Sequence, residues 1–271
     1  MIKSAVTIAL VPEIKTGPWI FWDNLEESMA KASALGFDAI ELFTASGSAI
    51  QEEKLKRLLD RYDLRLAAVG TGAGKVIHGL TLTDANSAIR KKAMAFVQEM
   101  MEFGATFGAP AIIGSMQGNS NQGTPHSYGI SLLAEALQML DQHAGSLGVK
   151  LIYEPLNRYE TNLMNTLDDG SDFIESNKFK NIQLLADLFH MNIEEVNPME
   201  SLQKNIQHVG HVHFADSNRK PVGSGHTQMK NIADVLIATG YDQYVSAEAF
   251  PWPSPDHAAE QTIHSFKRFF R

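Results

Sequence analysis

Four ionisable side chains in the second half of the chain each stand where a short apolar segment ends. They are Glu154, Asp187, His213 and Glu248. If these segments are neighbouring parallel strands, the four side chains converge on one site. Three carboxylates at close range raise the pKa of at least one of them, unless a positive charge lies among them. A divalent cation supplies that charge, and three carboxylate oxygens with one imidazole suit Mn²⁺, Mg²⁺ or Co²⁺.

The same residues also have a simpler interpretation. A single carboxylate at the end of a strand can cap a loop or form a surface ion pair, and each of the carboxylates could do so alone. The occurrence of such groups at four successive strand ends favours the metal site over separate structural roles. A structural zinc site is disfavoured, because such sites more often contain thiolates and the chain has no cysteine.

Eight apolar, β-rich segments alternate with longer segments that have helical spacing, such as 22–35 and 131–147. Eight units in 271 residues give about 34 residues each, which is the length of a repeat of one strand and one helix. The predicted strands are residues 4–10, 39–43, 65–69, 111–115, 150–154, 182–187, 211–214 and 244–249.

No linker rich in proline, serine or glycine divides the chain, and the composition does not shift along it. The eight units therefore predict an α/β protein with a single (β/α)₈ barrel domain over residues 1–271. A doubly wound sheet is disfavoured, because it more often has five or six strands. Active sites of such barrels lie at the carboxyl ends of the strands, where the four ionisable residues fall. Glycines at the predicted joints from helix to strand are expected to end the helices, and they are Gly36, Gly108, Gly148, Gly210 and Gly240.

The composition excludes several classes of function. Hydrophobic residues make up 44% of the chain and charged residues 20%, which is a globular balance and not that of a disordered protein. No apolar run reaches the roughly 18 residues that a membrane span needs. The formal net charge of −8, without a cluster of lysine or arginine, argues against nucleic acid as a partner. We expect a cytoplasmic protein that acts on a small molecule, with no membrane and no nucleic acid among its partners.

Three stretches and one further residue resemble a known family. The stretches are EPLNRYETN at 154–162, DLFHMNIEE at 187–195 and GHVHFADSNR at 210–219, and the residue is Glu248. The intervals between the four predicted ligands, 33, 26 and 35 residues, also resemble that family. The chain is similar to the xylose-isomerase-like sugar isomerases and epimerases, and among these to the D-tagatose and D-psicose (ketose) 3-epimerases.

The resemblance implies a xylose-isomerase-like barrel and a mechanism. In that family a divalent metal chelates the C2 carbonyl and the C3 hydroxyl of a ketose, which acidifies the proton on C3. One glutamate removes this proton to give an enediolate, and a second glutamate returns a proton from the opposite face, which inverts C3. The matching residues here are Glu154 and Glu248, which would be both catalytic residues and metal ligands.

The resemblance implies narrower roles for five other residues. Asp187 and His213 match residues that only bind the metal. His190 and Arg219 match groups near the C2 oxygen, where negative charge develops in the transition state. Glu160 matches a residue that holds the hydroxyls at the C1 end of the sugar. The expected partner is therefore a sugar, the expected metal is Mn²⁺, and the expected assembly is a homo-oligomer, either a dimer or a tetramer.

Other activities occur on the same barrel with a similar metal site. Inosose dehydratases, hydroxypyruvate isomerases and aldose–ketose isomerases are the alternatives, and the stretch 157–162 favours a 3-epimerase over them. A sugar-binding barrel without activity is disfavoured, because binding alone does not need two opposed glutamates. Endonuclease IV shares the fold, but its site of several zinc ions needs more histidines, and the net charge of −8 would repel DNA.

Three side chains near the predicted site have structural alternatives. His211 lies two residues before His213 and points to the same side of the strand. We expect His211 to be a hydrogen-bonded histidine one layer deeper in the barrel, and not a fifth ligand. Arg219 could pair with Asp216 instead of facing a substrate. Glu160 could be a solvated loop carboxylate.

Two glycine-rich segments and one aromatic segment lie in predicted loops. Residues 70–75 (GTGAGK) lack the spacing of a phosphate-binding or dinucleotide-binding loop, and we expect them to form a flexible loop beside the site. Residues 223–226 (GSGH) follow the seventh strand, where many barrels bind phosphate, so a phosphorylated substrate is an alternative. Trp19, Phe21 and Trp22 either pack a loop onto the barrel or shield an apolar face of the sugar.

Overall fold

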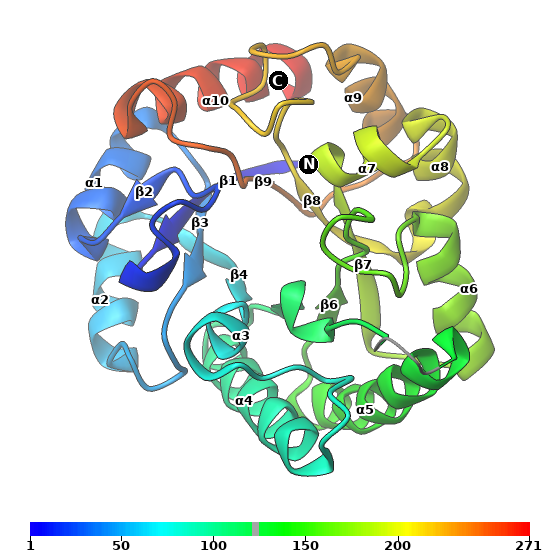
Figure 1. Cartoon of the computed structure of the whole chain (residues 1–271). Helices are drawn as coiled ribbons and strands as arrows, with labels where there is room; N and C mark the ends of the chain where they lie inside the picture. The colour runs from blue at the N-terminus through cyan, green and yellow to red at the C-terminus, as the bar shows by residue number, and fades with distance from the viewer. Residues whose placement is uncertain (121–124) are drawn as a thin grey trace.

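The computed structural model describes residues 1–120 and 125–271, and a closed barrel of eight parallel strands forms its centre (Figure 1). The barrel strands are β1 (Lys3–Ala9), β3 (Ala39–Phe43), β4 (Arg65–Gly70), β5 (Ala111–Ile113), β6 (Leu151–Tyr153), β7 (Ile182–Asp187), β8 (Val209–His213) and β9 (Tyr244–Ala247). Each pairs with the next, and β9 closes the ring by pairing with β1, from Lys3 with Tyr244 to Val6 with Ala247. The predicted (β/α)₈ barrel is confirmed.

A further short strand, β2 (Phe21–Trp22), was not predicted. It pairs in parallel with the end of β1, at Ile8 and Ala9. The sequence pattern placed residue 22 in a helix, but the first helix begins only at Leu25. Asn24 fixes this start, because its side chain accepts a hydrogen bond from the backbone N–H of Glu27 at 3.2 Å.

Helices form an outer ring around the barrel (Figure 1). The last helix lies beside the first, so the ring of helices closes as the strands do. No helix within residues 1–120 and 125–271 is long and apolar enough to cross a membrane. The helices are α1 (Leu25–Leu35), α2 (Glu52–Tyr62), α3 (Ala73–His78), α4 (Ser87–Thr106), α5 (His126–Leu147), α6 (Leu167–Asn177), α7 (Leu188–Glu194), α8 (Pro198–Asn205), α9 (Met229–Ala238) and α10 (Pro255–Phe270), with 3₁₀ turns η1 (Pro12–Ile14), η2 (Ser115–Gln117) and η3 (Ile206–His208).

The predicted glycine joints are confirmed at four positions and wrong at one. Gly36, Gly108, Gly148 and Gly240 follow α1, α4, α5 and α9 with positive φ angles of 85°, 68°, 70° and 74°. Gly210 instead lies inside β8. A Cβ atom at this position would come within 2.5 Å of Gln183 Oε1 on β7. Gly210 is the extra residue where the pairing of β7 with β8 shifts register, and the Gln183 side chain fills the space beside it, which explains glycine at this position.

Alternate residues of each strand point into the barrel. On one side the interior is filled by the buried cluster of Ala68, Ile112, Ile152 and Leu185 from β4 to β7. The buried polar residues Glu41 and His211, from β3 and β8, also lie within barrel strands. The interior is therefore a packed core that supports whatever lies at the carboxyl ends of the strands.

Candidate metal centre and its cavity

The four predicted ligands meet at the carboxyl ends of four adjacent strands. Asp187 and His213 end β7 and β8, and Glu154 and Glu248 directly follow β6 and β9. One possible ligand atom from each lies within 4.8 Å of all the others, and all four residues are buried. His213 Nδ1 faces the three carboxylates, at 3.3 Å from Asp187 Oδ2, 3.4 Å from Glu248 Oε2 and 3.6 Å from Glu154 Oε1. The barrel topology therefore brings these side chains together as the sequence predicted.

The charge balance of this cluster fits a bound cation. Glu154 Oε1 is buried and has no hydrogen-bond partner in the described part of the chain. Burial, together with the carboxylates of Glu248 and Asp187, raises the pKa of Glu154 to about 8, although His213 opposes the shift. Glu154 therefore has a free oxygen and a raised pKa, and it faces two more carboxylates. The cluster needs one more positive charge to keep all three carboxylates ionised. A divalent ion would supply it, and the donor set of three carboxylates and one imidazole suits such an ion.

Asp187 joins the cluster to a helix terminus. Its Oδ1 atom accepts hydrogen bonds from the backbone N–H groups of Phe189, at 2.8 Å, and His190, at 3.3 Å, which caps α7. The cap leaves Oδ2 facing the cluster. Burial alone would raise the pKa of Asp187, but His190, His213 and Arg219 hold it well below its usual value.

Arg219 closes the cluster from the loop between β8 and α9. Its Nη2 atom donates to Glu248 Oε2 and lies 3.6 Å from Asp187 Oδ2, while Nη1 donates to Glu160 Oε1 at 3.5 Å. The guanidinium stacks on Phe189, 4.8 Å from the ring centre. Burial would lower its pKa, but the neighbouring carboxylates raise it further above the ordinary value. Burial would also raise the pKa of Glu248, but His213 and Arg219 hold it below its usual value.

The Arg219 side chain does not pair with Asp216, so the structural alternative for this arginine is wrong. The Asp216 carboxylate accepts hydrogen bonds from the backbone N–H groups of Ser217, Gly223 and Thr227, at 2.8, 2.8 and 3.0 Å. The contact between the two residues is a backbone hydrogen bond, in which the N–H of Arg219 donates to the carbonyl oxygen of Asp216 at 2.7 Å. Asp216 therefore shapes the loop that carries Arg219.

His190 lies behind the cluster with a defined tautomer. Its Nδ1 atom accepts a hydrogen bond from the backbone N–H of Asn157 at 3.2 Å, so Nε2 carries the ring proton. Nε2 faces Glu154 Oε1 at 3.8 Å and Asp187 Oδ2 at 3.7 Å. Burial, with Arg219 nearby, lowers the pKa of His190, although the carboxylates around it oppose the shift. Asn157 also donates to Glu160 Oε1 at 3.2 Å, so this one asparagine orients two of the predicted site residues.

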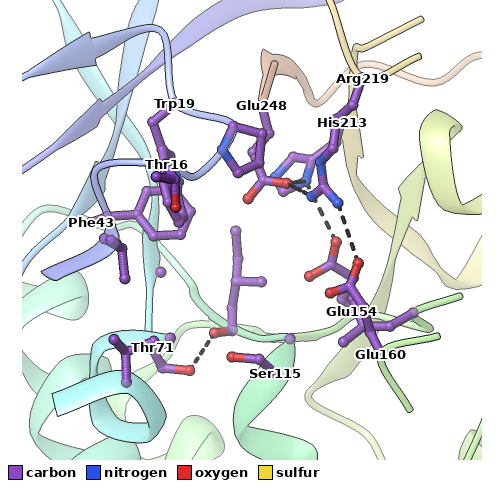
Figure 2. A pocket seen from close by; sticks show the side chains of 18 of the residues that line it. Thr16, Trp19, Phe43, Thr71, Ser115, Glu154, Glu160, His213, Arg219 and Glu248 are labelled. Atoms are coloured by element: carbon purple, nitrogen blue, oxygen red, sulfur yellow. Dashed lines mark hydrogen bonds and ion pairs between the residues drawn. The ribbon is translucent and has the colours of Figure 1, made fainter. Parts of the chain in front are cut away.

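A cavity of about 290 Å³ opens beside the cluster (Figure 2). Its charged side consists of Glu154, Glu160, His213, Arg219 and Glu248. The opposite side carries Trp19 and Phe43, whose rings lie 4.8 Å apart, and Figure 2 shows both facing across the cavity toward the charged groups. Asp187 and His190 do not line this cavity, whereas the Glu160 side chain lines it with 42% exposure.

The two glycine-rich segments differ in their relation to the cavity. Gly70, Thr71 and Gly72 line it, but residues 73–78 form α3, so the prediction of a flexible loop over 70–75 is wrong for its second half. Gly223 and Gly225 line a separate surface hollow. The backbone N–H of Gly223 donates a hydrogen bond to the Asp216 carboxylate. The glycines of 223–226 can therefore be explained by the structure of this loop, without a phosphate.

The sequence analysis missed Glu41. This residue is the only charged one in the apolar strand β3 (AIELF), and it is fully buried. Its carboxylate contacts His211 and His213, and together the three form a second group whose atoms could hold an ion. An ionised side chain in the middle of a buried strand was the available signal, because such a group needs a partner.

Comparison with known proteins identifies relatives of this barrel. The family model described as the xylose isomerase-like TIM barrel matches residues 29–269. The 3-dehydro-D-guloside 4-epimerase of Escherichia coli is 38% identical over 117 residues, which are 43% of this chain and 45% of that protein. The L-ribulose 3-epimerase of Mesorhizobium japonicum is 30% identical over 233 residues, which are 84% of this chain and 76% of that protein. A solved L-ribulose 3-epimerase structure has a TM-score of 0.84 at 23% identity, covering 100% of this chain and 95% of that one. The chain therefore belongs to the xylose isomerase-like TIM barrel family.

Proposed function

We propose that this protein is a metal-dependent sugar epimerase that inverts C3 of a ketose. The observation that carries the proposal is the pair Glu154 and Glu248, two buried glutamates that line one cavity at a cluster suited to a divalent cation. The relation to the L-ribulose 3-epimerase of Mesorhizobium japonicum, at 30% identity, supports the choice of reaction.

The proposed chemistry divides between the ion and the protein. Glu154, Asp187, His213 and Glu248 would hold the cation, Mn²⁺ in this proposal, and as a Lewis acid it would stabilise negative charge on the substrate oxygens. Glu248, held ionised by Arg219 and His213, can take the proton from C3, which leaves the electron pair of the C–H bond in an enediolate. Glu154, after taking up a proton from solvent on the oxygen that does not hold the ion, can then donate this proton to the opposite face of C3, while Glu248 gives its own proton to solvent; the two glutamates exchange roles in the reverse direction.

Three further residues would hold the substrate. Arg219, with its charge fixed, and the Nε2–H of His190 are donors that can face the C2 oxygen as it becomes negative. Their nitrogen atoms Nη1 and Nε2 lie 3.5 Å apart, and because His190 faces the cluster and does not line the cavity, the C2 oxygen would have to bind at the cluster to reach both donors. The half-exposed Glu160 can accept hydrogen bonds from hydroxyl groups at the C1 end.

The charges of the cavity favour an unphosphorylated ketose. Among the described lining residues, the cationic groups are Arg219 and His213, and both already face carboxylates. Away from the charged groups, the wall of the cavity contains Trp19, Phe43, Thr16, Thr71 and Ser115, and the Thr71 hydroxyl already donates to the carbonyl oxygen of Ile112. Such a wall suits the uncharged carbon chain of a free sugar better than a phosphate group.

A second candidate reaction is inversion of C4 in a 3-keto glycoside. The 38% identity to the 3-dehydro-D-guloside 4-epimerase of Escherichia coli, over 117 residues, favours it. The chemistry is the same in kind, because the inverted carbon again lies next to a carbonyl group.

A substrate screen in D₂O tests the proposal. The Mn²⁺-loaded protein is incubated with free ketopentoses and ketohexoses, their phosphates, 3-keto glycosides and an inosose, and the products are analysed by chromatography and NMR. We expect one ketose to be epimerised with deuterium at C3. Glu154→Gln and Glu248→Gln should each lower kcat by at least ~10²–10⁴-fold, the contribution of a general base, whereas Glu175→Gln, on the exposed face of α6, should not.

Other outcomes would replace the proposal. Deuterium at C4 of a 3-keto glycoside with unchanged ketoses would establish the second candidate. Loss of water from the inosose with every ketose unchanged would make the protein a dehydratase. Full activity of Glu248→Gln would remove that residue from the mechanism.

A further inference from the structure

Glu41 is a buried carboxylate whose two oxygens each contact one imidazole. Oε2 lies 2.8 Å from His211 Nε2, and Oε1 lies 3.1 Å from His213 Nε2. Glu41 is 0% exposed and both histidines are nearly fully buried, so water does not compete for these contacts. The planes of the two rings are 84° apart, and their centres are 5.5 Å apart. The carboxylate is thus held from two directions and has one orientation.

The contact with Glu41 decides which nitrogen of His213 faces the metal centre. A carboxylate accepts hydrogen bonds, so Nε2 of His213 carries the proton that it donates to Oε1. The other nitrogen, Nδ1, faces Asp187, Glu154 and Glu248 at 3.3–3.6 Å. Once Nδ1 is free of a proton, its lone pair points into the cluster. A histidine that binds metal through one nitrogen and donates to a carboxylate through the other is a stronger and better oriented ligand.

His211 completes the arrangement from one layer deeper in the barrel. It lies two residues before His213 in β8, so both rings point into the interior. By holding Oε2, His211 prevents the Glu41 carboxylate from turning away from His213. The distances of 2.8 and 3.1 Å are those of direct hydrogen bonds. Hydrogen bonding between these three side chains therefore explains the second group of possible ligands without a second ion.

We propose that Glu41 is a positioning residue for the metal centre, and that with His211 it fixes the tautomer and orientation of His213 for binding a divalent cation. The inference rests on the metal site of the proposed function. It assigns no part in proton transfer to Glu41, which does not line the cavity.

Binding of Mn²⁺ alone tests this role without any substrate. Metal-free protein is titrated with Mn²⁺ by calorimetry and by the EPR signal of free Mn²⁺. We expect one ion per chain, and a Kd that is about 10–100-fold weaker in Glu41→Gln, the usual effect of removing such a partner. Asp141→Asn is the matched control. Asp141 is also a buried carboxylate, but it accepts hydrogen bonds only from backbone N–H groups of residues 180 and 181, far from the cluster.

Two further measurements separate positioning from general loss of structure. The visible spectrum of the Co²⁺-loaded protein should change in Glu41→Gln and stay unchanged in Asp141→Asn, because it reports the geometry of the ligands. Circular dichroism and thermal unfolding of both metal-free variants show whether they fold. If Glu41→Gln does not fold, His211→Asn keeps the carboxylate but frees one of its oxygens, and we expect its Kd for Mn²⁺ to weaken by a smaller factor.

Each contrary result has a distinct meaning. Equal Mn²⁺ affinity and equal Co²⁺ spectra in a folded Glu41→Gln variant would overturn the inference. A second Mn²⁺ equivalent that disappears in Glu41→Gln would make Glu41 a ligand and also overturn it. If the unmodified chain binds no Mn²⁺, both the metal site and the inference fail. If it binds Mn²⁺ and depends on Glu41 but epimerises no sugar, the proposed function fails and the inference stands.

Discussion

Glu154 and Glu248 are the same residue type in two opposed electrostatic settings. Arg219 and His213 keep the pKa of Glu248 low, whereas burial and neighbouring carboxylates raise the pKa of Glu154 to about 8. Two carboxyl groups whose environments move their pKa values apart can serve as base and acid on one substrate. The difference also means that a cation must displace a proton from Glu154 before that oxygen can become a ligand.

This displacement predicts a pH-dependent binding of Mn²⁺. At pH 7 a carboxyl group with a pKa of about 8 is mostly protonated, and only the ionised form binds metal. Binding should therefore release about one proton from Glu154. Burial lowers the pKa of His213, but its carboxylate neighbours raise it by more, so the release is larger if His213 also loses a proton. The affinity for Mn²⁺ should therefore rise with pH from pH 6 through pH 8. Calorimetry in two buffers of different ionisation enthalpy measures the released protons.

Glu154→Gln provides the control for that measurement. The variant lacks the titrating carboxyl group, so it should release fewer protons at pH 7 and show a flatter pH dependence. Proton release of zero from the unmodified protein would contradict the prediction, because it would mean that Glu154 is already ionised without the metal.

At the scale of residues, the sequence predicted the groups that end strands, and also the hydrogen-bonded His211 one layer deeper in β8, but it missed Glu41 inside β3. Glu154, Asp187, His213 and Glu248 could be found because the carboxyl ends of barrel strands converge whatever the details of packing. Glu41 could not be assigned a partner, since His211 is 170 positions away in the chain. Asn157 was part of a recognised stretch, but its contact with His190 depends on how two loops meet.

At the scale of elements, the loop between β8 and α9 determines where Arg219 lies. The Asp216 carboxylate collects three backbone N–H groups of this loop, and Arg219 has a positive φ of 55°. Gly225 is required by the same contact, because a Cβ atom there would come within 2.4 Å of Asp216 Oδ1. The loop is therefore organised around one buried carboxylate before its arginine reaches the cluster.

Replacing Asp216 should displace Arg219 without touching the metal ligands. In Asp216→Asn one acceptor oxygen becomes an NH₂ group that faces a backbone N–H, a loss of about 1–3 kcal/mol of stability for an unsatisfied group. We expect a lower Tm, unchanged Mn²⁺ content, and a decrease in kcat/KM toward that of Arg219→Ala. The latter should reach about 10²–10³-fold, the usual effect of losing one donor to a developing oxyanion.

Kinetics on the epimerised ketose and metal analysis check these expectations together. Glu26 supplies a control, since Glu26→Gln removes an exposed ion pair with Arg61 between α1 and α2 and should leave kcat/KM near that of the unmodified protein. An Asp216→Asn enzyme with a lowered Tm and full kcat/KM would show that Arg219 keeps its place without the carboxylate.

Regular elements were easier to predict than their exceptions. The eight barrel strands follow from apolar runs, but β2 has only two residues and depends on its pairing with β1. The helix α3 was hidden in a glycine-rich segment, because local composition favoured a loop. The role of Gly210 was predicted wrongly because a glycine that ends a helix and a glycine at a register shift between two strands are identical in sequence.

At the scale of the whole molecule, the cluster joins strands that the barrel holds side by side. The four candidate ligands come from β6, β7, β8 and β9, and β9 in turn pairs with β1 to close the ring. Without a cation, three buried carboxylates share the positive charge of Arg219 and His213. A bound ion would relieve their repulsion only while these strands remain folded and adjacent. Metal binding and global stability should therefore be linked.

Thermal unfolding with and without Mn²⁺ measures this link. At a free concentration 100 times its Kd, a ligand that binds only the folded state adds about 2.7 kcal/mol to the free energy of unfolding. For a chain of this size we expect a rise in Tm of roughly 5–10 °C, which chelation should reverse.

Asp187→Asn is the informative control, because asparagine can still accept the hydrogen bonds that cap α7 but supplies no charge to the ion. This variant should fold, with a Tm that responds much less to the same Mn²⁺ concentration. Equal Tm values of the unmodified protein with and without saturating Mn²⁺ would place the ion elsewhere or exclude it, and an undiminished shift in Asp187→Asn would remove that residue from the site.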